Sequence, residues 1–164
     1  MISALSSRVR EPNKSDWEKG CRLIRSLRGT KNLHLILRYD GLSICKWHVD
    51  ASFGVHPDFK SHSGGVMLMH AKGGGMASGS IKQKLNTRSL TEAELVASDD
   101  FLSKIIWVIL FLSEQGIDLK KNVLFQDNKS AILLEKKGRA AAGKCSRAIN
   151  IQYFTIRMMS RKGI

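Results

Sequence analysis

A chain of 164 residues with 43% hydrophobic residues and only two prolines can bury one sizeable core, which excludes a disordered polypeptide and favours one main globular domain. Lys and Arg outnumber Asp and Glu by 27 to 14, and the resulting net charge of +13 favours a polyanionic partner. The alternative is a basic surface that serves only solubility or packs against an acidic neighbour.

The cysteines Cys21, Cys45 and Cys145 lie far apart and form no Cys-x-x-Cys pair. This pattern predicts neither a disulfide framework nor a zinc site, and it fits a reducing, intracellular compartment. The N-terminal residues lack the apolar core of a signal peptide, and the longest apolar run, 105–112, is too short to cross a bilayer. We therefore expect no membrane role.

The first element that the sequence predicts is a short basic amphipathic helix. Ser15 and Glu18 form a capping-box pattern, apolar residues then recur at helical spacing, and Gly29 ends the run. The arginines on its polar face could bind phosphates, although a solvated face is the commoner role of such a charged row.

A first β-hairpin is expected after this helix. Residues 33–38 alternate in a pattern typical of a strand, and the Asp40-Gly41 pair that follows is a good two-residue turn. Residues 42–49 would form the second strand, which ends at Asp50.

A second hairpin is expected after a polar loop over residues 53–62. Residues 66–70 and 76–81 have strand character, and they flank the glycine run 73–75. The glycines supply the conformational freedom that the turn between the two strands needs.

A long helix is predicted over residues 92–114. Thr91 and Glu94 form a capping-box pattern at its start, and Gly116 follows its end. Its second half is apolar enough to predict a central place in the core.

The last elements expected are a short apolar strand over 122–126 and a helix over 129–137 that Gly138 closes. Residues 139–147 are small and basic and predict a loop, and residues 149–159 are apolar with an ambiguous period. The order of strands in hairpins, long helix, strand and helix predicts an α/β fold, with helices packed on a mixed sheet.

Three carboxylates stand at the ends of these elements. Asp50 ends a strand in VDAS, Glu94 opens the long helix in TEAEL, and Asp127 ends the next strand in QDNKSA. Strand ends and helix starts at one edge of a sheet can converge, so these acids could line one pocket. Carboxylate oxygens suit magnesium, and two such ions roughly 4 Å apart can activate water and stabilise the leaving oxygen of a phosphodiester.

Each acid also has a plain structural explanation. Asp50 could form a turn at the strand end, Glu94 could be the returning half of the capping box, and Asp127 could be an N-cap. The spacing of all three acids together, with the local sequence around them, favours the metal site over these separate explanations.

Four motifs carry a more specific signal, within a match that covers roughly residues 47–153. They are SHSGGVMLM, GGGMASGSIKQK, SLTEAELVASDD and LFQDNKSAILL. In order and spacing they resemble the RNase H region of copia-type LTR retrotransposon polyproteins. Upstream, residues 7–37 resemble the tail of the family's reverse transcriptase, but the polymerase motif Tyr-x-Asp-Asp is not in the chain.

This resemblance implies an RNase H-like fold and two domains. Residues 1–40 would be the tail of the reverse transcriptase, and residues 41–164 an RNase H-like domain that stops before its last, acid-bearing helix. The implied activity is hydrolysis of the RNA strand of RNA:DNA hybrids. The expected partners are the hybrid and the reverse transcriptase domain of the same polyprotein, in a cytoplasmic particle or the nucleus.

The resemblance also implies roles for individual residues. Asp50, Glu94 and Asp127 would be the catalytic acids and would bind two Mg²⁺ ions, or Mn²⁺ in their place. Lys82 and Gln83 match the family's Lys-Gln strand. Hydroxyl, amide or amine groups that could contact the hybrid belong to Ser52, Lys82, Gln83, Ser89, Thr91 and Asn128.

Two departures from the family pattern leave an alternative open. Ala148 and Asn150 stand where the family usually has His and Asp, and the segment that would carry a fourth acid falls beyond Ile164. The chain could therefore be a non-catalytic, nucleic-acid-binding remnant of a retroelement. An integrase-like transferase of the same broad fold is disfavoured, because the hairpin and TEAEL sequences match the hydrolase.

Overall fold

The computed structural model describes residues 2–38, 44–70 and 72–137. The chain divides into two compact units, residues 1–36 and 37–164. Within the described ranges, no helix combines the length and hydrophobicity that a membrane span requires. The first unit contains α1 (Ile2–Ser6) and α2 (Lys14–Gly29).

The predicted N-terminal helix is confirmed as α2, but the predicted cap is wrong. The helix begins two residues earlier than the Ser15 box implies, because Asn13 caps it. The Asn13 side-chain oxygen accepts from the Asp16 amide at 2.9 Å, and the Asp16 carboxylate accepts from the Asn13 amide at 3.1 Å. The hydrogen bond from the Asn13 amide, together with the nearby Arg8, lowers the pKa of Asp16.

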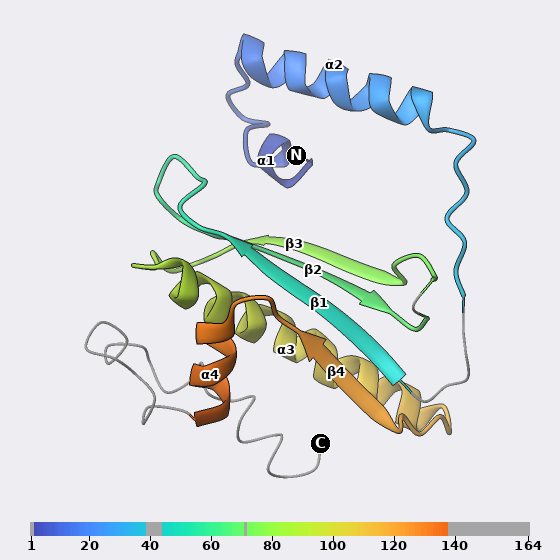
Figure 1. The fold of residues 1–164 in the computed structure, drawn as a ribbon. Coiled ribbons are helices and arrows are strands. Elements are labelled where there is room, and N and C mark those ends of the chain that lie inside the picture. The colour runs from blue at the N-terminus through green and yellow to red at the C-terminus, as the bar shows by residue number, and fades with distance from the viewer. Residues whose placement is uncertain (1, 39–43, 71, 138–164) are drawn as a thin grey trace. The chain divides into compact units, whose positions relative to one another are not determined.

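The second unit is built on a four-stranded mixed sheet with strand order β3-β2-β1-β4. β2 is antiparallel to both β1 and β3, whereas β4 is parallel to β1 (Figure 1). The strands are β1 (Ile44–Ser52), β2 (His62–Leu68), β3 (Ala77–Lys82) and β4 (Lys121–Phe125), and the helices are α3 (Leu90–Glu114) and α4 (Lys129–Lys137).

The fold class that the sequence predicts is confirmed: α/β, with a mixed sheet and helices packed on it. α3 packs on β1 and β2, and α4 packs on α3. A crossover through α3 places β4 beside β1, as a parallel pairing requires. This arrangement is consistent with an RNase H-like fold.

The second predicted hairpin, the short strand and the last helix are confirmed as β2–β3, β4 and α4. The first hairpin is wrong, because residues 33–38 form no strand and β1 pairs with β2 and β4 instead. Alternation predicts a strand but does not choose its partner. The expected turn at Asp40-Gly41 and the expectations for residues 138–164 lie outside the described residues.

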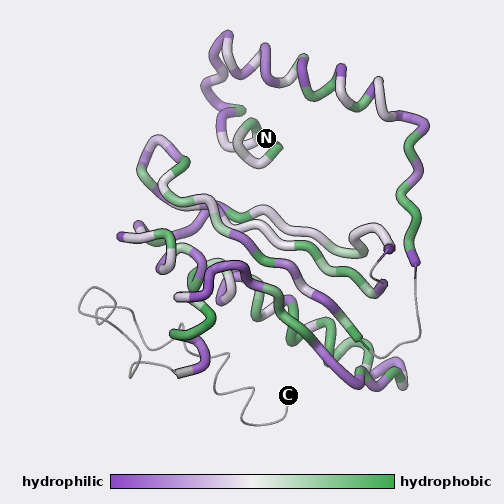
Figure 2. Tube along the Cα trace, in the orientation of Figure 1, coloured by the Kyte–Doolittle hydropathy of each residue, from purple (hydrophilic) through white to green (hydrophobic). Residues whose placement is uncertain are grey.

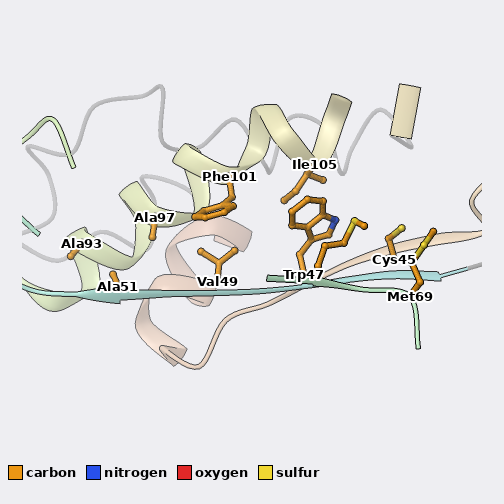
Figure 3. Packing of buried hydrophobic residues seen from close by; sticks show 10 residues of the cluster. Cys45, Trp47, Val49, Ala51, Met69, Ala93, Ala97, Phe101 and Ile105 are labelled. Atoms are coloured by element: carbon orange, nitrogen blue, oxygen red, sulfur yellow. The ribbon is translucent and has the colours of Figure 1, made fainter. Parts of the chain in front are cut away.

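The core lies between the sheet and α3. Hydrophobic and hydrophilic residues alternate along β1 (Figure 2), and every second residue faces the core. Figure 3 shows side chains of β1 meeting those of α3. The buried residues of this contact are Cys45, Trp47, Val49 and Ala51 on β1, and Ala93, Ala97, Phe101 and Ile105 on α3.

The first half of α3 is the more buried half, so the predicted central place of its second half is only partly right: Val108, Ile109 and Leu112 pack against the core but are only partly buried. Trp107, Leu110 and Phe111 are exposed, whereas Ala93, Ala97 and Ser98 are fully buried. The physical reason is that small side chains let the helix approach the sheet closely. A count of large apolar residues underrates this kind of contact.

Two glycines, Gly65 and Gly79, make room for the Phe101 ring. A Cβ at Gly65 would lie 2.5 Å from Phe101 Cε1, whereas a Cβ at the adjacent Gly64 would meet nothing closer than the Asp50 carbonyl oxygen at 3.9 Å. We expect Gly65→Ala to lower the free energy of unfolding by about 1–3 kcal/mol. Gly64→Ala should change it by less than about 0.5 kcal/mol. Urea unfolding measures both, and equal stability of the two variants would contradict this packing.

Candidate metal centre

The structure brings the three predicted acids together from three elements. Asp50 lies on β1, Glu94 in the first turns of α3, and Asp127 just after β4. One carboxylate oxygen of each lies within 4.8 Å of those of the other two.

The parallel pairing of β1 with β4 explains why Asp50 and Asp127 meet. His48 and Phe125 are register partners, and each acid follows its own partner by two residues. The two acids therefore lie at the same end of this strand pair, although Asp50 does not end its strand as predicted, because β1 continues to Ser52 and Asp50 pairs with Gly64. α3 then supplies Glu94 from above β1, the strand on which its first half packs.

Ser89, and not Thr91, caps α3, which corrects the predicted capping box. The Ser89 hydroxyl accepts from the Glu92 amide at 3.2 Å, and the Glu92 carboxylate accepts from the Arg88 amide at 2.7 Å. Glu92 therefore completes the helix start. Glu94, one half-turn further, is left free of any capping role and faces the other two acids.

The electrostatics of this cluster disfavour three negative charges. Glu94 is only 2% exposed, and burial is the main reason that its pKa is raised above the usual value. Hydrogen bonds from Gln126 and from the Ala51 backbone act in the opposite direction, while Asp50 and Asp127 raise the pKa further. A divalent cation would relieve this repulsion, and three hard oxygen donors suit Mg²⁺ or Mn²⁺.

Asp50 and Asp127 border a shallow hollow of about 650 Å³, and the buried Glu94 is not part of its lining. Its walls include Asp50, Gly64 and Asp127, together with His48 and Phe125. The last two rings are stacked, with their centroids 4.7 Å apart and their planes 7° apart. The hollow is large enough for a ligand of nucleotide size.

Four of the six predicted contact residues have structural partners, and three of these four lie at the surface or are only partly buried. The Asn128 side-chain oxygen accepts from the amides of Ser130 and Ala131 at 3.0 and 3.1 Å, so Asn128 caps α4. Ser89 caps α3, and Lys82 Nζ lies 2.9 Å from an Asp58 carboxylate oxygen.

Ser52, Thr91 and Gln83, the other three predicted contact residues, differ in exposure. Ser52 is exposed at the end of β1, and Thr91 is half-buried in α3. Gln83 is only 1% exposed, and its amide donates to Ser63 Oγ and to the Ala93 carbonyl. The buried position of Gln83 indicates a structural role.

Gln126 is a site residue that the sequence reasoning missed. Its amide nitrogen donates to Glu94 Oε2 at 3.0 Å, and its amide oxygen accepts from the Asp127 amide at 2.9 Å. One side chain therefore contacts two of the acid-bearing residues. Its position next to Asp127 was the only available signal, because a neutral amide has no distinctive pattern.

Sequence comparison identifies a relative over nearly the whole chain. The retrovirus-related Pol polyprotein from transposon TNT 1-94 of Nicotiana tabacum is 31% identical over 159 residues, which are 96% of this chain. The chain is homologous to part of a retrotransposon Pol polyprotein. It spans 12% of the length of that relative, and no protein-family model matches it.

Proposed function

We propose that this part of the Pol polyprotein is an RNase H-type domain that hydrolyses the RNA strand of RNA:DNA hybrids. The observation that carries the proposal is the convergence of Asp50, Glu94 and Asp127 within 4.8 Å. The net charge of +13 supports a nucleic-acid substrate, and the homology to a Pol polyprotein supports a role in reverse transcription. In this assignment residues 1–40 are the tail of the reverse transcriptase.

Each side chain has a distinct part in the proposed reaction. Asp50 and Asp127 are exposed and border the hollow, so they would bind cations that also contact a substrate phosphate. Glu94 is buried and would supply an inner ligand. When bound, a pair of Mg²⁺ ions would activate a water and stabilise the leaving oxygen. The ring of His48, held by Phe125, would flank the phosphodiester strand.

The experiment is a cleavage assay on an RNA:DNA hybrid with labelled RNA, with and without Mg²⁺. We expect Mg²⁺-dependent cleavage by the wild type and no cleavage by Asp127→Asn, because that variant loses a charged ligand. Asp118→Asn is the matched control, since Asp118 is an exposed acid before the opposite end of β4. Equal cleavage by the wild type and Asp127→Asn would contradict the proposal.

The same assay tests the nucleic-acid-binding remnant, which the positive charge also favours. A remnant would bind the hybrid without cleaving it, and log affinity would fall linearly with log salt concentration. Duplex DNA and duplex RNA of the same sequence serve as competing substrates. Cleavage confined to the hybrid would exclude the remnant.

A further inference from the structure

Two glutamines hold the start of α3 from opposite sides. Gln83 Nε2 donates to the Ala93 carbonyl at 2.8 Å, and Gln126 Nε2 donates to Glu94 Oε2 at 3.0 Å and to the Glu94 carbonyl at 3.5 Å. Their acceptors belong to Ala93 and Glu94, which are adjacent in the chain.

Each glutamine also contacts a strand that flanks β1. Gln83 Nε2 donates to Ser63 Oγ on β2 at 2.9 Å, and Gln126 directly follows β4. In the sheet, β2 and β4 lie on either side of β1, which carries Asp50 (Figure 1). The start of α3 is therefore linked to β2 and to the end of β4, the two strands that flank β1.

The buried hydrogen bonds of Gln83 continue through Ser63 to a second position on α3. Ser63 Oγ accepts from Gln83 and donates to Asp100 Oδ2 at 2.7 Å, about two turns after Ala93 along α3. Gln83 and Ser63 are almost fully buried, so losing one partner would leave polar groups unsatisfied away from water. This cost holds the register between β2, β3 and α3.

The half-buried Gln126 side chain connects the Glu94 carboxylate to the backbone of Asp127. The Gln126 amide donates to the Glu94 carboxylate, while its oxygen accepts from the Asp127 amide at 2.9 Å and the Asn128 amide at 3.4 Å. A rotation of this side chain would therefore move Glu94 relative to the β4–α4 turn. Partners of this kind set the orientation of metal ligands.

We propose that Gln83 and Gln126 form a glutamine clamp, a pair of positioning residues that keeps Glu94 within ligand distance of Asp50 and Asp127. The inference rests on the proposed metal site. In the clamp, Gln126 orients the carboxylate itself, and Gln83 fixes the backbone of the preceding residue. Neither amide contacts the reacting atoms.

The test measures Mn²⁺ affinity by electron paramagnetic resonance on the full chain. Gln126→Met keeps the side-chain length and removes the side-chain hydrogen bonds to Glu94, Asp127 and Asn128. We expect it to weaken Mn²⁺ binding by about 10–100-fold. Its thermal unfolding midpoint should stay close to that of the wild type, because Gln126 lies at the surface edge of the site. Gln115→Met is the control, since the exposed Gln115 follows the other end of α3 and should leave the affinity unchanged.

Hydrogen exchange supplies a readout that needs no metal. Gln83→Met should accelerate exchange of the amides at residues 93–97, because it removes the donor to the Ala93 carbonyl and loosens that turn. Exchange in the second half of α3, beyond Ile105, is the internal reference. Unchanged exchange at 93–97 would overturn the part assigned to Gln83.

The possible outcomes separate the clamp from the proposed activity. The clamp would be overturned if Gln126→Met bound Mn²⁺ with an affinity within about twofold of the wild type. Such a change is far smaller than the effect of about 10–100-fold expected for a residue that orients a metal ligand. A wild-type chain that binds Mn²⁺ but cleaves no hybrid would overturn the proposed hydrolysis and leave the clamp standing. A wild-type chain that binds no Mn²⁺ would overturn both.

Discussion

Glu94→Gln should abolish metal-dependent hydrolysis and at the same time stabilise the metal-free protein. Glu94 is buried, its pKa is raised by burial and by two neighbouring acids, and the three carboxylates repel one another without a cation. A neutral amide of the same length removes this repulsion. We expect a gain of roughly 0.5–2 kcal/mol, the common size of a single stabilising substitution.

Mg²⁺ should narrow or reverse the difference in stability between Glu94→Gln and the wild type. A ligand that binds only the folded state raises stability with its concentration, so Mg²⁺ should stabilise the wild type and have little effect on Glu94→Gln. Loss of a residue that only hydrogen-bonds to a metal ligand typically costs about 10–100-fold in activity. Because Glu94→Gln removes a direct ligand, cleavage of the hybrid should fall by more than this. Thermal unfolding in EDTA and in Mg²⁺ measures the first effect, and the hybrid assay measures the second.

Glu92→Gln is the matched control for this experiment. Glu92 lies two residues earlier in the same helix, is only partly exposed, and accepts from the Arg88 amide. Its neutralisation should lower stability by no more than about 1 kcal/mol and leave Mg²⁺ binding intact. If Glu92→Gln lost activity as Glu94→Gln does, the assignment of Glu94 as the ligand would be wrong.

Phe101→Ala should have the largest effect on stability. Phe101 is fully buried between α3 and the sheet, where it lies over Gly65 and Gly79. Removing its ring leaves a cavity that these two glycines cannot fill. We expect a loss of roughly 3–5 kcal/mol in the free energy of unfolding, measured by urea denaturation.

Phe111→Ala tests whether burial is the cause. Phe111 is in the same helix and has the same side chain, but it is 47% exposed and stacks on Trp107. Its replacement should cost less than about 1 kcal/mol. Similar losses for both variants would mean that the first half of α3 does not form the main contact with the sheet.

The location of most elements could be predicted from local sequence signals. Glycines at 73–75, the strand-like run before Asp127 and the periodic stretch before Gly116 each predict an element that the structure contains. The two errors in helix capping have a common cause. Asn13 and Ser89 replace the predicted caps because Asn, Ser and Thr are nearly equivalent at an N-cap, so several candidates near a helix start look alike.

The candidate site was predictable in part. Asp50, Glu94 and Asp127 are visible because carboxylates at element ends are unusual as a set. The positioning roles of Gln83 and Gln126 could not be predicted, because the role of a side-chain amide depends on the groups that it contacts in the folded protein. Gln83, expected at the substrate, is buried beneath α3, and Gln126 joins Glu94 to the turn after β4.

The sequence by itself determined the order and type of most elements in the second unit, the positive charge and the three candidate acids. These depend on residue spacing and local conformational preference, which act over a few residues. Only the tertiary structure decided that β1 pairs with β4, which half of α3 is buried, and that the carboxylates converge. Those features depend on contacts between segments that are distant in the chain, and such contacts form only when the sheet and α3 pack together.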